Sequence, residues 1–209
     1  MQNPRVYDAN VAVDAVVSTN KVLRNTYMLL GLTLLFSAMT AGVAMAMNLS
    51  HTMALVLMLV GFGLLFVVNR TADSGKGLVA IFAFTGVMGA SLGPMLSYYL
   101  QMANGPAMVM QALGGTAVVF FGLSAYARTT RKDFAYLGGF LMVGLIAAIV
   151  AMIANIFLAI PALQLTISAV VVMIMSGLIL FDTSRIVNGG ETNYIRATVG
   201  LYLNIYNLF

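Results

Sequence analysis

The chain contains few side chains that could carry chemistry, and the most informative is a single acid within an apolar run. Asp182 lies near the end of a run that covers residues 161–184. If this run crosses a membrane, a carboxylate there is costly and is a functional candidate by default. Arg185 follows at i+3, where an ion pair can form on one helix face. We interpret Asp182 either as half of an ion pair near the membrane surface or as a gating or ion-binding carboxylate.

No arrangement of residues predicts a reaction. The sequence has no cysteine and only one histidine, His51, so a thiol nucleophile and a cysteine metal site are excluded. An aspartyl protease needs two carboxylates that share a site, and Asp182 is the only acid within the apolar runs. The zinc-protease motif HExxH is absent. We therefore predict that the protein is not an enzyme and has no catalytic, cofactor-binding or metal site.

The amino-acid composition indicates the class of protein to which the chain belongs. The 209 residues are 61% hydrophobic and 8% charged, with a mean hydropathy of +0.99. A soluble domain carries roughly 25% charged residues, so a water-soluble globule is excluded. Intrinsic disorder requires low hydrophobicity and high charge. The net charge of +4 does not indicate a nucleic-acid partner, and the lipid bilayer is the expected environment.

Charged and polar residues divide the chain into seven apolar runs, which cover about 26–47, 52–69, 77–100, 106–127, 134–159, 161–184 and 194–209. About 20 apolar residues make one transmembrane helix. We predict an all-α, polytopic bundle of seven transmembrane helices over 21–209, preceded by a polar tail over 1–20. From Arg196 to Phe209 a helix spans only about 20 Å, less than the roughly 30 Å of hydrocarbon. We expect the last helix to be truncated at Phe209 and to continue in the native protein.

The basic residues predict the orientation of the bundle. When the loops are assigned alternately to two sides, one side receives all ten: Arg5, Lys21, Arg24, Arg70, Lys76, Arg128, Arg131, Lys132, Arg185 and Arg196. The other side receives 48–51, 101–105 and 159–160, which contain none. Basic loops stay in the cytoplasm. The tail is therefore predicted to be cytoplasmic, and a complete seventh helix would place the C-terminus outside.

Small residues indicate where helices pack closely. Gly89 and Gly93 form a GxxxG pattern in the third run, and Pro94 follows directly. Such glycines let helix backbones approach each other. We attribute most glycines of the third and fourth runs to packing, including Gly114 and Gly115; a hinge or pore-lining break at Gly93–Pro94 is the alternative.

Asn204 and Asn207 are the polar residues with the clearest placement in the last run. They lie three residues apart and share one helix face. We expect this face to meet Asp182 where the sixth and seventh helices pack. Neutral polar residues in such positions are more often interhelical contacts than reactive groups.

Several segments together resemble the Bax inhibitor-1 family and its bacterial YccA branch. The family signature is similar to 89–96 (GASLGPML), 112–120 (ALGGTAVVF), 181–186 (FDTSRI) and 201–209 (LYLNIYNLF), and the branch to 21–27 (KVLRNTY), 129–133 (TTRKD) and 189–197 (GGETNYIRA). The resemblance implies a seven-helix bundle with a central helix wrapped by the others. It also implies a seventh helix that extends beyond Phe209.

For the bacterial branch, the resemblance implies an inner-membrane protein that binds and restrains the membrane AAA+ protease FtsH. It also implies association with the HflK–HflC complex and slow degradation by the protease itself. We expect the tail over 1–20 to provide the unstructured entry point that an ATP-driven unfoldase needs, so deletion of 2–15 is expected to slow turnover.

Other branches of the family imply an alternative function, a pH-sensitive calcium or proton leak. There a carboxylate pair on helices six and seven forms the gate. Asp182 matches the first position, and the second falls on Asn204, which does not ionise. Two coupled carboxylates raise a pKa and make a proton switch, and an Asp–Asn pair lacks that coupling. The candidate gate or ion-binding residues are Asp182, Arg185 and Asn204.

Overall fold

The computed structural model describes the backbone of residues 4–209 and the side chains of 18–209; residues 1–3 of the predicted tail lie outside the described residues. The chain forms the helices α1 (Pro4–Ala46), α2 (His51–Thr71), α3 (Lys76–Leu100), α4 (Gly105–Thr130), α5 (Leu137–Leu158), α6 (Pro161–Val187) and α7 (Tyr194–Leu208). All seven predicted helices are present, and their ends agree with the apolar runs to within a few residues, except at the start of α1. The predicted all-α bundle is confirmed.

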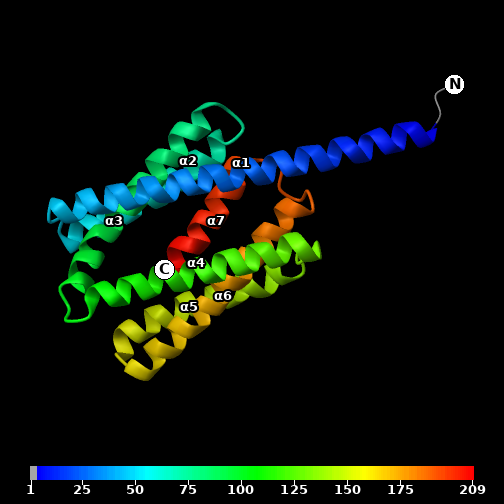
Figure 1. The fold of residues 1–209 in the computed structure, drawn as a ribbon. Coiled ribbons are helices and arrows are strands. Elements are labelled where there is room, and N and C mark those ends of the chain that lie inside the picture. The colour runs from blue at the N-terminus through cyan, green and yellow to red at the C-terminus, as the bar shows by residue number, and fades with distance from the viewer. Residues whose placement is uncertain (1–3) are drawn as a thin grey trace.

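The beginning of α1 differs from the expectation. Its helix starts at Pro4 and continues without interruption to Ala46, and its N-terminal part extends beyond the other helices (Figure 1). The segment over 4–20 is therefore not an unstructured tail. No proline or glycine stands between Pro4 and Gly31, so the sequence carries no residue that would end a helix there.

Among the residues whose side chains are described, six segments are long and apolar enough to cross a membrane: Ser18–Ala46 of α1 and the whole of α2, α3, α4, α5 and α6. Their outward faces carry large exposed apolar side chains, for example Phe66, Phe140 and Phe157. Exposure of such an apolar surface to water costs free energy, and contact with lipid avoids this cost. These exposed residues are consistent with a polytopic membrane protein.

The central position of α7 organises the bundle. Helices α1, α2 and α3 lie on one side of it and α4, α5 and α6 on the other (Figure 1), and α7 packs against α1, α2, α3, α4 and α6. Its side chains at Leu201 and Tyr202 are fully buried. The arrangement implied by the family resemblance, a central helix wrapped by the others, is present.

Local sequence signals set several helix ends. Ser50 accepts a hydrogen bond from the Met53 amide at 3.2 Å and caps α2. Proline occupies the first turn of α4 and of α6, where its missing N–H costs nothing. The C-terminal end of α4 turns at Arg131, which has a φ of 51°.

Contacts between distant loops gather the basic residues at one end of the bundle. Arg196 at the start of α7 pairs with Asp73 in the α2–α3 loop. The Ser184 hydroxyl near the end of α6 donates to the Lys132 carbonyl in the α4–α5 loop at 3.0 Å. We call this end, which carries the α2–α3, α4–α5 and α6–α7 loops, the basic end.

Candidate functional site

Asp182 lies on α6 and faces α7. Its Oδ2 accepts a hydrogen bond from Asn204 Nδ2 at 2.7 Å, and Asn204 is only 6% exposed. Gly200 makes this approach possible, because a Cβ there would lie 3.0 Å from Asp182 Oδ2. The expectation that Asn204 meets Asp182 is confirmed. Asn207 does not join them; it is exposed and donates to Leu203 O of its own helix.

Arg185 does not form the ion pair with Asp182 that its i+3 position allowed. Its Nη2 lies 3.5 Å from Glu191 Oε2, and its guanidinium lies 5.5 Å from the Phe181 ring centre. The reason is the turn after α6, in which the amides of Gly190 and Glu191 both donate to the Arg185 carbonyl. This turn brings the Glu191 carboxylate back over the end of α6, where it neutralises Arg185.

A cavity of about 290 Å³ lies between α2, α6 and α7 near the basic end. Asp182 lines it together with Arg185, Glu191 and Arg196. Arg185 pairs with Glu191, whereas the described hydrogen-bond partner of the Asp182 carboxylate is the neutral Asn204. A carboxylate in this position can hold a proton or a small cation.

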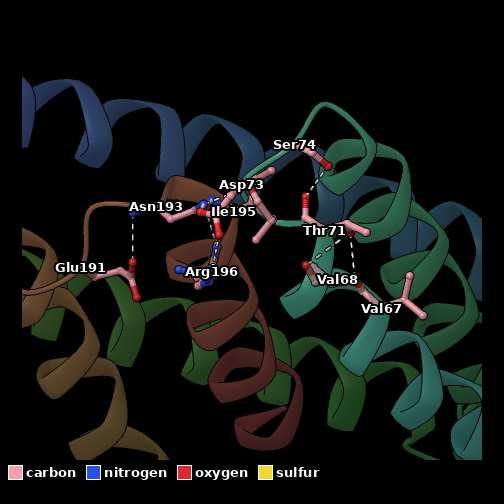
Figure 2. Close-up of polar contacts among 10 residues, drawn as sticks. Val67, Val68, Thr71, Asp73, Ser74, Glu191, Asn193, Ile195 and Arg196 are labelled. Atoms are coloured by element: carbon pink, nitrogen blue, oxygen red, sulfur yellow. Dashed lines mark hydrogen bonds and ion pairs between the residues drawn. The ribbon is translucent and has the colours of Figure 1, made fainter.

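A polar clamp, formed by Asp73, Asn193 and Arg196, joins the α2–α3 loop to the start of α7 (Figure 2). The Asp73 carboxylate accepts from Arg196 and, at 2.7 Å, from Asn193 Nδ2. Asn193 Nδ2 also donates to Ala72 O at 2.9 Å, while its Oδ1 accepts from the Ile195 amide at 2.8 Å and caps α7. One asparagine thus starts α7 and fixes its position against α2.

A second polar cluster lies inside the bundle at the contact of α1, α3 and α7. The Ser37 hydroxyl donates to Thr85 O at 2.6 Å and lies 2.7 Å from Tyr202 Oη. All three residues are buried. A buried hydroxyl without a partner would cost free energy, so this mutual bonding fixes how the three helices rotate relative to each other.

Gly89 and Gly93 of α3 pack as predicted, but Gly114 and Gly115 of α4 do not. A Cβ at Gly89 would lie 2.3 Å from Ser37 O, and one at Gly93 would lie 2.6 Å from Ala44 Cβ. Both glycines therefore allow close contact with α1, and Pro94 lies inside an α3 that is unbroken from Lys76 to Leu100. For Gly114 and Gly115 the packing interpretation is wrong, because nothing lies within 4 Å of a Cβ at either position.

Comparison with known proteins identifies the family of the chain. The family model described as "Inhibitor of apoptosis-promoting Bax1" matches residues 19–209, which is nearly the whole chain. The chain belongs to this family.

Among relatives, "Modulator of FtsH protease YccA" of Escherichia coli K12 is 55% identical over 196 residues, which is 93% of this chain and 89% of that protein. The corresponding protein of E. coli O6:H1, with the same identity and coverage, is called an inner membrane protein. A membrane protein of Vibrio cholerae is 50% identical over 99% of this chain and 93% of its own length.

As a member of the Bax inhibitor-1 family, the chain presents Asp182 and Asn204 where the resemblance placed them, on adjoining helices. The sequence interpretation missed the clamp acid Asp73 and the Ser37–Tyr202 contact. Asn193 gave a usable signal, since an asparagine before an apolar run is a typical helix N-cap. No comparable signal marked Asp73, whose partners lie more than a hundred residues away in the sequence.

Proposed function

We propose that this chain is a non-enzymatic inner-membrane protein that binds the membrane protease FtsH and restrains it. The observation that carries the proposal is the 55% identity, over nearly the full length of both chains, to the relative named a modulator of that protease. We extend the proposal to the HflK–HflC complex as a further partner, on the family resemblance.

The fold supports a physical route to restraint. A protease that pulls its substrates from the N-terminus would engage α1, whose helix starts at Pro4 and leads into the bundle. Inside the bundle α1 packs on α3 and α7, so extraction must separate these helices. Slow extraction keeps the protease engaged and lowers its turnover of other substrates. The helical start of α1, in place of an unstructured tail, adds a segment that must be unwound first.

We place the basic end in the cytoplasm, because basic loops are retained on that side. The chain has no cysteine, so single cysteines can be introduced at Lys132, Arg196 and Ala103. The first two are expected to be labelled from the cytoplasmic side by a membrane-impermeant reagent, and the third from the opposite side. Labelling of Lys132→Cys and Arg196→Cys from opposite sides would contradict the topology.

Co-purification tests the binding. The full chain, expressed with a proteolytically inactive FtsH, is expected to capture the protease from solubilised membranes. In cells with active FtsH, replacement of residues 2–15 by a Gly/Ser linker of equal length tests the route of entry. Because the linker removes helix that must be unwound first, we expect faster turnover of the chain. Absence of co-purification together with unchanged turnover would refute the proposal.

The second candidate function is a calcium or proton leak, and the cavity at Asp182 is the observation that favours it. In liposomes, Asp182→Asn is expected to change any flux that passes this cavity, while Asp133→Asn, in the α4–α5 loop, leaves it unchanged. Equal flux in both variants and the original chain would exclude Asp182 as the gate.

A further inference from the structure

A second cavity at the basic end is separate from the one at Asp182. It has a volume of about 510 Å³ and lies between residues 19–23 of α1 and the ends of α4 and α6. Its polar lining includes Thr19, Asn20, Arg128, Thr129 and Arg131. We call it the α1–α4 pocket.

The pocket is positively charged. Arg128 and Arg131 both line it, and none of its described lining residues is acidic. Among the residues with described side chains, neither arginine forms an ion pair; Arg128 lies 5.9 Å from the Tyr27 ring centre. Two arginines that share one cavity and form no described ion pair repel each other and favour the binding of an anion.

The neutral side chains of the pocket suit an anionic group that accepts hydrogen bonds. Thr19 and Asn20 of α1 line the pocket together with Arg128 of α4 and Arg131, which follows α4. They carry a hydroxyl and an amide, which donate to oxygen. Leu23 and Val187 add apolar surface between them. Arginine binds phosphate oxygens through two parallel N–H groups.

The pocket also lies at the depth at which lipid phosphates are found. Arg128 is in the last turn of α4, and Thr19 lies on α1 just before Lys21 and Arg24, which precede the apolar run of that helix. Both therefore mark the boundary between the apolar bundle and its basic end. Basic pockets between transmembrane helices are known to bind anionic headgroups.

We propose that the α1–α4 pocket binds an anionic phosphate group, held by Arg128 and Arg131. The group is supplied either by an anionic phospholipid or by free phosphate, which share this chemistry. A cavity of 510 Å³ falls within the range that holds whole small molecules, so a headgroup larger than the phosphate itself fits.

The test uses the full chain in mild detergent and measures bound lipid by native mass spectrometry. Phosphatidylglycerol, phosphatidylcholine and inorganic phosphate are each added as separate probes. Arg128→Gln/Arg131→Asn removes both charges, and asparagine tolerates the positive φ at 131. Arg70→Gln/Lys76→Gln is the matched control, since it removes two charges at the same end but outside the pocket.

We expect the pocket variant to bind phosphatidylglycerol at least about tenfold more weakly, since two charge-assisted contacts are lost, and the control variant to bind it normally. Because Arg128 also contacts Tyr27, a second variant, Thr129→Glu, places a carboxylate in the pocket and leaves both arginines in place. It is expected to lose binding as well.

The probes distinguish the two sources of phosphate. Selective retention of phosphatidylglycerol identifies a lipid headgroup, whereas its displacement by millimolar inorganic phosphate identifies a site for the free ion. Unchanged binding in Arg128→Gln/Arg131→Asn and in Thr129→Glu, or an equal loss in the control variant, would overturn the proposal.

Discussion

Replacement of Gly89 by alanine tests how α1 and α3 are held together. The new Cβ would lie 2.3 Å from the Ser37 carbonyl oxygen and 2.5 Å from Thr40 Oγ1. The nearest atom belongs to the backbone, which cannot rotate away, so α1 and α3 must separate by about 1 Å to restore van der Waals contact. The same movement stretches the hydrogen bond from Ser37 to Thr85, which is 2.6 Å long in the native bundle.

The expected loss follows from these contacts. Overpacking costs about 1–3 kcal/mol, and weakening a buried hydrogen bond costs about 1 kcal/mol more. Alanine in place of glycine returns about 1 kcal/mol of helix propensity. The free energy of unfolding is therefore expected to fall by about 2 kcal/mol, which corresponds to a decrease in Tm of roughly 4–8 °C for a chain of this size.

Thermal unfolding of the detergent-solubilised protein measures this effect, and Gly114→Ala is the matched control. Nothing lies within 4 Å of a Cβ at position 114, so only the gain in helix propensity, about 1 kcal/mol, applies there. Gly114→Ala is expected to leave Tm unchanged or raise it. A Gly89→Ala variant as stable as the original chain, or an equal decrease in both variants, would refute the packing assigned to α1 and α3.

Three further predictions concern the polar contacts. Tyr202→Phe removes a buried hydroxyl bonded to α1 and is expected to lower the free energy of unfolding by about 1–2 kcal/mol in denaturant titration; no loss would show that the Ser37–Tyr202 contact does not stabilise the bundle. A double-mutant cycle of Asp182→Ala and Asn204→Ala is expected to give a coupling of about 1.5–3 kcal/mol, and additive effects would contradict a direct bond. The same cycle for Asp73→Ala and Arg196→Ala is expected to give less than about 1 kcal/mol, decreasing with salt, because both side chains are substantially exposed; a large salt-independent coupling would contradict this.

The ends of the helices were predictable from the sequence because charges and prolines mark them directly. Arg70, Arg128 and Arg185 each lie in the last turn of a helix, and Pro106 and Pro161 lie in the first turn of α4 and α6. In a membrane chain the charged residues are costly within the bilayer, and proline suits the first turn of a helix. Their positions therefore define the spans with little interference from tertiary packing.

The rotation of each helix was not predictable in the same way. Lipid and protein interiors are both apolar, so a transmembrane helix carries little pattern that tells its packed face from its lipid-facing one. Glycines occur within both α3 and α4, yet Gly89 meets α1 and Gly114 faces open space.

Contacts between side chains were predictable only where another constraint already fixed the geometry. Asn204 meets Asp182, as the family resemblance implied. Arg185 pairs with Glu191 and not with Asp182, because the backbone hydrogen bonds of the turn after α6 bring Glu191 close to it. The spacing of residues along one helix does not predict such a contact.

The central claim is that the chain restrains FtsH, and the most direct measurement is the degradation rate of a membrane substrate by FtsH reconstituted in liposomes. With ATP present, addition of the full chain is predicted to lower the rate in a saturable manner. Gly89→Ala, whose helices separate more easily, is predicted to restrain the protease less than Gly114→Ala does. A degradation rate that stays constant as the original chain is added in excess would contradict the claim.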